Sequence, residues 1–309
     1  MKRISNQRTI WYLLLLTLAA LALMSACGEK GETDAKVQKT VAAEPVSDSV
    51  ASADGVMIHY TVAGHGEPAL VFVHGWCCDG TYWKDQVAAF DSTHKVITVD
   101  LAGHGQSGIN RSNWTIEAFG GDVAAVVEKL DLKKVILIGH SMGGPVDIEA
   151  ARKLGDRVVG LIGVDTYQNV TAKFPPEQQK AFLQGMSADF VAFTKGFVGQ
   201  MFPSDADTTL RNRVAQDMAS APPEVGIAAM KALFDYDAVA ALKEMPKPIY
   251  AINADMWPTK VDDNRSVMDF FEVDYMKGHG HFLYLEDPAT FNGLLAADIA
   301  KLTGAPTHE

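Results

Sequence analysis

The chain has 309 residues, of which 48% are hydrophobic and 21% charged, so it can bury a sizeable core in one or two domains. Its formal net charge of −11, with no cluster of lysine or arginine, argues against nucleic acid as a partner. No internal repeat is visible.

Residues 1–26 are typical of a bacterial export signal. Three basic residues lie within the first eight, and the segment 9–24 is almost continuously apolar. The following Ser25-Ala26-Cys27 resembles the cleavage box of bacterial lipoproteins. The resemblance implies cleavage before Cys27, lipidation of that cysteine, and a location on the cell envelope facing an extracytoplasmic space, with the outer membrane favoured. An uncleaved membrane anchor, or cleavage elsewhere, is the alternative.

The rest of the chain divides by composition. Residues 28–51 are polar and small without a sustained period, so Cys27 and this segment are interpreted as a lipidated tether, 27–51. From residue 52 short apolar strands alternate with helical patterns, which predicts a mostly parallel α/β sheet with helices on both faces. We assign 52–166 and 246–309 to this core and 167–245 to a helical cap.

The elements expected in the core follow one another in a regular rhythm. They are strands 56–62 and 69–73, helix 82–90, strand 95–99, a helix capped by Thr115 and ending at Leu130, strand 135–138, helix 145–154 and strand 158–164. Residues 167–245 then predict helices only. Strands return at 248–253 and 271–276, and a last helix spans 288–302. Such an insert predicts a cap over the carboxyl edge of the sheet, where open α/β sheets place their sites.

The most informative motif is Gly139-His140-Ser141-Met142-Gly143, which lies between an apolar strand and a helix. A strand–turn–helix junction this tight needs small residues on either side of the serine, and it lifts the hydroxyl above the sheet edge. Ser141 is therefore the candidate nucleophile.

Three further motifs accompany the serine: His74-Gly75-Trp76, the loop 100–107 and Gly278-His279-Gly280-His281-Phe282. With the serine motif they resemble the α/β-hydrolase superfamily, specifically its capped serine hydrolases, over about residues 52–304. The resemblance implies an enzyme that needs no cofactor and no metal. The serine argues against haloalkane dehalogenases and epoxide hydrolases, which use an aspartate at that position.

A serine hydroxyl needs a base, and the base needs an acid that orients it. His281 matches the family's histidine motif, and His279 is its nearest competitor. Asp255, just past strand 248–253, has the usual position of the acid. The alternatives for the acid are Asp165, at the end of the preceding strand, and then Asp262 and Asp263.

The oxyanion of the intermediate needs preorganised donors. The resemblance assigns them to the backbone N–H groups of Trp76 and Met142. The phenylalanines Phe190, Phe193 and Phe197 form one stripe of a cap helix, so some of them are candidates, with Trp257, for an apolar acyl pocket. Packing within the cap is the alternative for each.

The sequence thus indicates a serine esterase that cleaves a small to medium apolar ester or lactone. We expect it to be a monomer that is anchored to the membrane by lipid. A lactonase, an amidase, a carbon–carbon hydrolase or a perhydrolase would keep the same triad, and a non-catalytic binding lipoprotein is the alternative of another class. The adjacent Cys77 and Cys78 are interpreted as free thiols, with a vicinal disulfide as the alternative.

Overall fold

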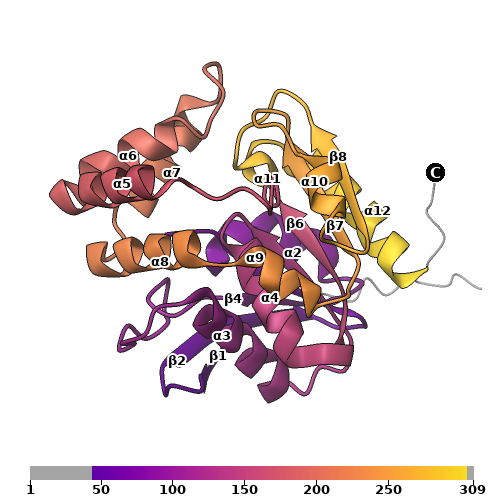
Figure 1. The fold of residues 1–309 in the computed structure, drawn as a ribbon. Coiled ribbons are helices and arrows are strands. Elements are labelled where there is room, and N and C mark those ends of the chain that lie inside the picture. Colours follow the sequence, from indigo (N-terminus) through magenta and orange to yellow (C-terminus); the bar gives the residue numbers. More distant parts are fainter. Residues whose placement is uncertain (1–43, 305–309) are drawn as a thin grey trace, which may run out of the picture. The chain divides into compact units, whose positions relative to one another are not determined.

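The computed structural model describes residues 44–304. Eight strands form one sheet in the order β1-β2-β4-β3-β5-β6-β7-β8 (Figure 1). The strands are β1 (Val46–Ala51), β2 (Met57–Gly64), β3 (Ala69–Val73), β4 (Lys95–Val99), β5 (Val135–His140), β6 (Val158–Val164), β7 (Ile249–Ala254) and β8 (Phe271–Met276). β1 and β2 are antiparallel to their neighbours, and the six strands from β4 to β8 across the sheet are parallel. The predicted fold class is confirmed.

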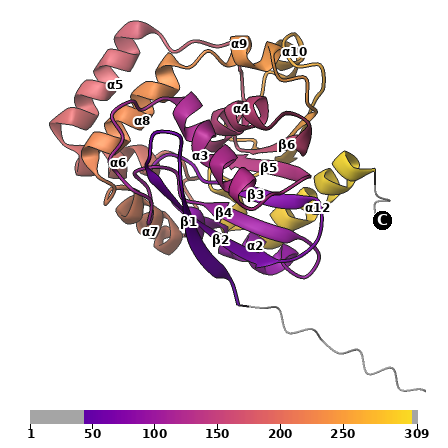
Figure 2. The same cartoon turned by 90° about the horizontal axis from the view of Figure 1, so that it is seen from below.

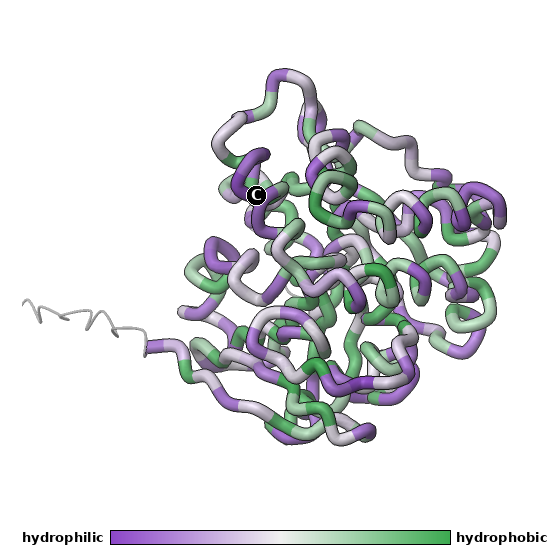
Figure 3. The backbone as a smooth tube through the Cα atoms, turned by 90° about the vertical axis from the view of Figure 1, so that its left-hand side faces the viewer, coloured by the Kyte–Doolittle hydropathy of each residue, from purple (hydrophilic) through white to green (hydrophobic). Residues whose placement is uncertain are grey.

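The central strands are apolar because both faces of the sheet are covered. Every residue of β3, β5 and β7 is buried, as expected for parallel strands between two helical layers. α3 (Ile116–Lys129) and α4 (Gly143–Leu154) pack together on one face, while α2 (Lys84–Phe90) and α12 (Pro288–Thr303) cover the other (Figure 2). In Figure 3 the hydrophobic segments run mainly through the interior of this unit.

The helical insert lies between β6 and β7. It comprises α5 (Pro176–Ala188), α6 (Phe190–Gly199), α7 (Thr208–Met218), α8 (Pro223–Asp235) and α9 (Ala238–Lys243). Helices α5 to α8 lie together in Figure 1. α9 packs against α4 of the core, and α8 also contacts α3.

Several local predictions are confirmed and a few are wrong. Thr115 caps α3 by accepting a hydrogen bond from the N–H of Ala118. The predicted tether is wrong for residues 46–51, which form β1 against β2. Three of its six residues are polar and none is fully buried, so it lacks the alternation of a half-buried strand. Two short helices, α10 (Val261–Arg265) and α11 (Leu283–Glu286), were not predicted.

The signal peptide and the lipidation site at Cys27 lie outside the described residues, so both stay predictions. Within residues 44–304, no helix is both long enough and apolar enough to cross a membrane.

Candidate active site

Ser141 sits in the sharp turn that the sequence predicts. Its φ angle is 52°, a left-handed conformation that costs about 1–2 kcal/mol for a non-glycine residue. The glycines two positions before and two positions after the serine allow this turn to pack closely against its neighbours. A Cβ at Gly139 would lie 2.5 Å from Asp147 Oδ2, and one at Gly143 would lie 2.5 Å from the carbonyl oxygen of Val73. The turn therefore lies directly against β3.

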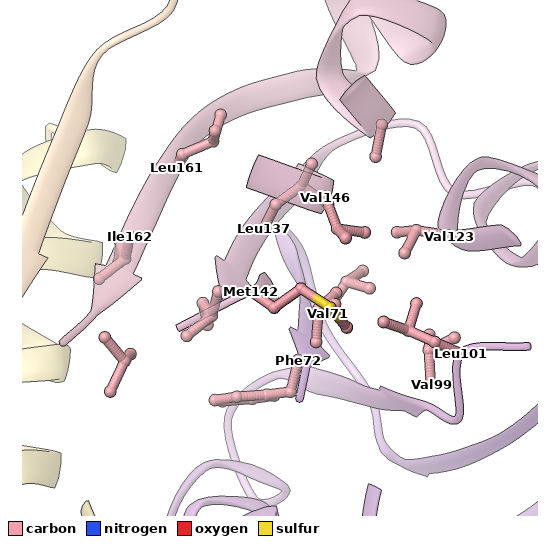
Figure 4. Close-up of a cluster of buried hydrophobic side chains, with 14 of the residues drawn as sticks. Val71, Phe72, Val99, Leu101, Val123, Leu137, Met142, Val146, Leu161 and Ile162 are labelled. Atoms are coloured by element: carbon pink, nitrogen blue, oxygen red, sulfur yellow. The ribbon is translucent and has the colours of Figure 1, made fainter. Parts of the chain in front are cut away.

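The residue after the serine is anchored in the core. Met142 is fully buried, and its side chain points into the cluster of apolar residues between β3, β5, α3 and α4 (Figure 4). This packing fixes its backbone at the N-terminus of α4. Its N–H donates to no backbone or side-chain acceptor among residues 44–304, so it is free to bind a ligand oxygen.

The loop after β3 brings a second free N–H beside this turn. A Cβ at Gly75 would lie 2.7 Å from His140 Nδ1 and 3.3 Å from the carbonyl oxygen of His140, so Gly75 is pressed against the end of β5. The N–H of Cys78 donates to Gly75 O at 3.2 Å and closes a turn in which Cys77 has a φ angle of 55°. The N–H of Trp76, in this turn, also has no acceptor among the described residues.

His281 is the imidazole that reaches the serine's cavity. His281 is 8% exposed. Its backbone N–H donates to Met201 O at 2.8 Å, and its backbone carbonyl oxygen accepts from His140 Nε2–H at 2.9 Å. His279 points elsewhere: its Nδ1–H donates to Lys277 O, and it lines a different hollow. The structure therefore favours His281 over His279.

The carboxylate that meets His281 is Asp165, and the expectation of Asp255 is wrong. His281 Nδ1–H donates to Asp165 Oδ2 at 2.5 Å, while Asp165 Oδ1 accepts from the N–H of Ala254 at 2.9 Å. Asp255 is exposed, and its Oδ1 accepts the N–H of Gly278. The reason lies in the strand order. Asp165 follows β6, the direct neighbour of β5, whereas Asp255 follows β7, one strand further from the serine.

Asp165 is held in a left-handed conformation, with φ at 43°. The amide of the buried Asn253 pairs with both backbone groups of the next residue: its Oδ1 accepts from Thr166 N at 3.2 Å, and its Nδ2 donates to Thr166 O at 3.0 Å. Asn264 Nδ2 donates to Tyr167 O at 2.5 Å. Sequence reasoning missed both asparagines. For Asn253 the available signal was a polar residue inside the apolar strand β7. Asn264 lies in the short helix α10, which the sequence pattern did not predict.

Ser141, Asp165 and His281 open on one cavity of about 600 Å³. Of the four predicted pocket residues, Phe197 and Trp257 line it. Phe190 and Phe193 are not in the lining; Phe190 packs against Trp76 and Phe193 against Phe182. Met201, which continues the stripe of Phe190, Phe193 and Phe197 in the sequence, lines the cavity too. The cap residues of the lining that the sequence did not single out are Phe174, Phe182, Met218, Met230, Leu233 and Phe234. Among the described residues, four ionisable side chains line the cavity: Cys78, His140, Asp165 and His281.

The other titratable groups near the serine are held in their neutral forms by burial. Burial lowers the pKa of His140 well below its usual range and raises the pKa of the Cys78 thiol well above its own. A protonated thiol is a poor nucleophile, so Cys78 does not compete with Ser141. Cys77 and Cys78 are both free thiols in the structure, as expected.

Comparison with known proteins agrees with this geometry. The model of a family described as alpha/beta hydrolase family matches residues 70–294. Non-heme chloroperoxidase CPO-A1 of Kitasatospora aureofaciens is 39% identical over 110 residues, which cover 35% of this chain and 38% of that relative. The chain therefore spans less than half of that relative's length.

Two solved structures share the fold. An esterase (EaEST) from Exiguobacterium antarcticum has a TM-score of 0.75 and 19% identity, over 82% of this chain and 99% of the esterase. Est816, described as an N-acyl homoserine lactone degrading enzyme, has a TM-score of 0.69 and 24% identity, over 81% of this chain and 99% of Est816. At these identities the likeness concerns the fold alone.

Proposed function

Because the chain belongs to the alpha/beta hydrolase family, we propose that it is a serine hydrolase that cleaves a carboxylic ester or lactone of a small to medium apolar substrate. The observation that carries this proposal is the arrangement around one cavity. A serine in a strained turn and a histidine bonded through Nδ1 to a buried carboxylate both line it.

The reaction follows from this arrangement. Ser141 Oγ attacks the carbonyl carbon and gives its proton to His281 Nε2, because Nδ1 carries the proton bonded to Asp165. The N–H groups of Trp76 and Met142 stabilise the oxyanion. The intermediate collapses by breaking the bond to the leaving oxygen, which takes the proton from His281. Water then attacks the acyl-enzyme, with His281 again as the base, and releases the acid and the free serine.

The lining of the cavity favours a neutral, apolar acyl group. Seven phenylalanine and methionine side chains of the cap line the cavity, and no lysine or arginine among the described residues lines it to pair with an anionic substrate. Each methylene group buried there contributes about 0.8 kcal/mol, so we expect kcat/KM to rise with acyl length until the 600 Å³ are filled.

A lactone is the natural extension of this substrate class. In a lactone the leaving oxygen stays tethered to the acyl group, so the triad and the oxyanion donors perform the same steps. Est816, whose fold is similar, is described as acting on N-acyl homoserine lactones. We therefore include lactones in the proposal beside open-chain esters.

A fluorophosphonate probe tests the proposal directly, because only an activated serine reacts with it. We expect the wild-type protein to be labelled and Ser141→Ala not to be labelled. A panel of p-nitrophenyl esters of increasing acyl length then measures the substrate class. A wild-type protein that neither labels nor hydrolyses any ester would refute the proposal and leave a binding lipoprotein as the better account.

We further propose that the enzyme acts at the cell envelope, anchored by lipid on Cys27. The support is the apolar segment 9–24 followed by two small residues and a cysteine. Two acyl chains suffice for stable attachment to a membrane, and a lipoprotein cysteine carries several.

A further inference from the structure

Trp76 connects the proposed oxyanion hole to the cap through its side chain. Its indole Nε1–H donates to the carbonyl oxygen of Gly226 in α8 at 2.8 Å, and the bond is buried. Its ring also packs edge-on against Phe190 and Phe197 of α6, with centroid distances of 6.0 and 6.2 Å. The residue that offers a free N–H beside Ser141 is thus held by two cap helices.

Gly226 is the reason that α8 can come so close. A Cβ at this position would lie 2.6 Å from Phe190 Cζ and 3.1 Å from Cys77 Sγ. The distance to Phe190 is shorter than real Cβ contacts and the distance to Cys77 is tighter than most of them, so a side chain here would force α8 and the Phe190 ring apart and press on Cys77. The close approach and the indole hydrogen bond therefore depend on each other.

The core holds the peptide before Trp76 by its carbonyl oxygen: Gly75 O accepts from His74 Nδ1–H at 2.8 Å and from the N–H of Cys78 at 3.2 Å. The residue after Trp76, Cys77, is strained, with φ at 55°. The cap contacts of the indole hold Trp76 from the other side. An oxyanion donor acts only when it is aimed within a few tenths of an ångström, and a misplacement of 1 Å can cost about 100-fold in rate.

We propose that the indole of Trp76 is a positioning group. Through it the cap, when packed on the core, holds the backbone N–H of Trp76 in the orientation that binds the oxyanion. This inference rests on the proposed function, because it concerns the same N–H group. Its consequence is that the cap contributes to turnover as well as to substrate binding. A substrate that packs against the cap helices holds α8 in place and thereby completes the oxyanion hole.

A second hydrogen bond between cap and core provides a matched control. Tyr82 Oη donates to Asp217 Oδ2 of α7 at 2.6 Å, but Tyr82 carries no proposed oxyanion donor and does not line the catalytic cavity. Trp76→Phe and Tyr82→Phe each remove one bond between cap and core, and each leaves an aromatic ring in place.

The experiment measures kcat, KM and the Kd of an alkyl trifluoromethyl ketone, whose serine adduct carries the oxyanion. For Trp76→Phe we expect kcat and the affinity for the ketone to fall by about 10-fold or more, while the Kd of the product carboxylic acid changes far less. For Tyr82→Phe we expect kcat and ketone affinity to stay within about twofold of wild type.

A second pair of variants approaches the same contact from the cap. Gly226→Ala should lower kcat and ketone affinity as Trp76→Phe does, although alanine favours a helix by about 1 kcal/mol. Gly196→Ala, in α6, is the control, because a Cβ there would meet nothing within 4 Å. It should leave kcat unchanged.

The outcomes separate the inference from the proposed function. If the wild-type protein labels with fluorophosphonate but Trp76→Phe and Gly226→Ala keep wild-type kcat, the positioning role is wrong and the hydrolase proposal stands. Equal losses in Trp76→Phe and Tyr82→Phe would also overturn it, because they would show general loosening of the cap. No labelling of the wild type would overturn the hydrolase proposal itself.

Discussion

His281 and Asp165 form a buried pair, with Nδ1 and Oδ2 at 2.5 Å, although 116 residues separate them in the chain. The other oxygen of Asp165 accepts the N–H of Ala254, so the carboxylate is fixed from two sides. This pair orients the imidazole, and in the mechanism we propose the Nε2 atom that remains accepts the proton of Ser141.

The first prediction concerns the identity of the acid. Asp165→Asn should lower kcat by about 10³- to 10⁴-fold, because the amide no longer favours the productive tautomer or the protonated imidazole. Asp255→Asn is the control: its side-chain oxygen still accepts the N–H of Gly278, so kcat should stay near that of wild type. Steady-state hydrolysis of an active ester measures both. A larger loss in Asp255→Asn would return the role to that residue.

The second prediction concerns the support of Asp165. Asn253→Leu, nearly isosteric, should remove both hydrogen bonds to Thr166 and leave that buried backbone unpaired, at about 1–3 kcal/mol of unfolding free energy. It should lower kcat by about 10-fold or more, since the carboxylate loses its fixed position. Thr259→Val removes only the third contact of Asn253, at 2.9 Å, and should keep kcat. Urea unfolding and kcat, measured together, separate stability from catalysis. Unchanged kcat in a destabilised Asn253→Leu would limit Asn253 to a structural role.

The third prediction concerns substrate length. Phe197 lines the cavity whereas Phe193, one turn earlier on α6, does not. Phe197→Ala should enlarge the cavity and shift the preferred ester toward longer acyl chains. Phe193→Ala should lower stability through lost packing against Phe182 and leave the preference unchanged. The ratio of kcat/KM for long and short esters reports the result. An identical shift in both variants would contradict the assigned lining.

The fourth prediction concerns pH. Asp147 is buried behind the turn of Ser141, neither of its oxygens has a hydrogen-bond partner among the described residues, and burial raises its pKa well above 3.8. Between the pKa of Asp147 in the unfolded chain, about 4, and its raised pKa in the folded protein, the unfolded chain has lost the proton that the folded protein keeps. The free energy of unfolding therefore falls as pH rises through this range. Asp147→Asn cannot ionise. The difference between its unfolding free energy and that of wild type should therefore increase, in favour of Asp147→Asn, by up to about 1.4 kcal/mol per pH unit in this pH range.

Urea unfolding of both proteins between pH 4 and pH 7 measures this difference. A difference that does not change with pH would mean that Asp147 has the same pKa in the folded and unfolded chains.

The fifth prediction concerns location. Cys27→Ser should abolish incorporation of labelled palmitate in cells and leave an unprocessed precursor. A chain that begins at residue 44 keeps β1 and should hydrolyse esters at the wild-type rate without lipid. Continued labelling of Cys27→Ser would refute the lipoprotein proposal.

Local features of the sequence determined much of this protein. Thr115 caps its helix, the apolar runs mark the buried strands, and Ser141 and His281 belong to motifs whose function depends on their immediate neighbours. These signals are readable because each reflects contacts between residues close together in the chain. They were sufficient to predict the fold class and to single out Ser141 and His281, which line one cavity.

Only the tertiary structure decided which carboxylate meets His281, which residues line the cavity and where the sheet begins. Asp165 and Asp255 both follow buried strands, and the choice depends on which strand lies beside β5, which no local pattern records. Phe190 and Phe197 share one stripe of α6, yet only Phe197 reaches the cavity, because α8 and Trp76 cover the other. No residue of β1 is fully buried, so its pairing with β2, rather than burial, makes it a strand. In each case the deciding contacts join residues far apart in the chain, and the packing of the folded protein alone brings them together.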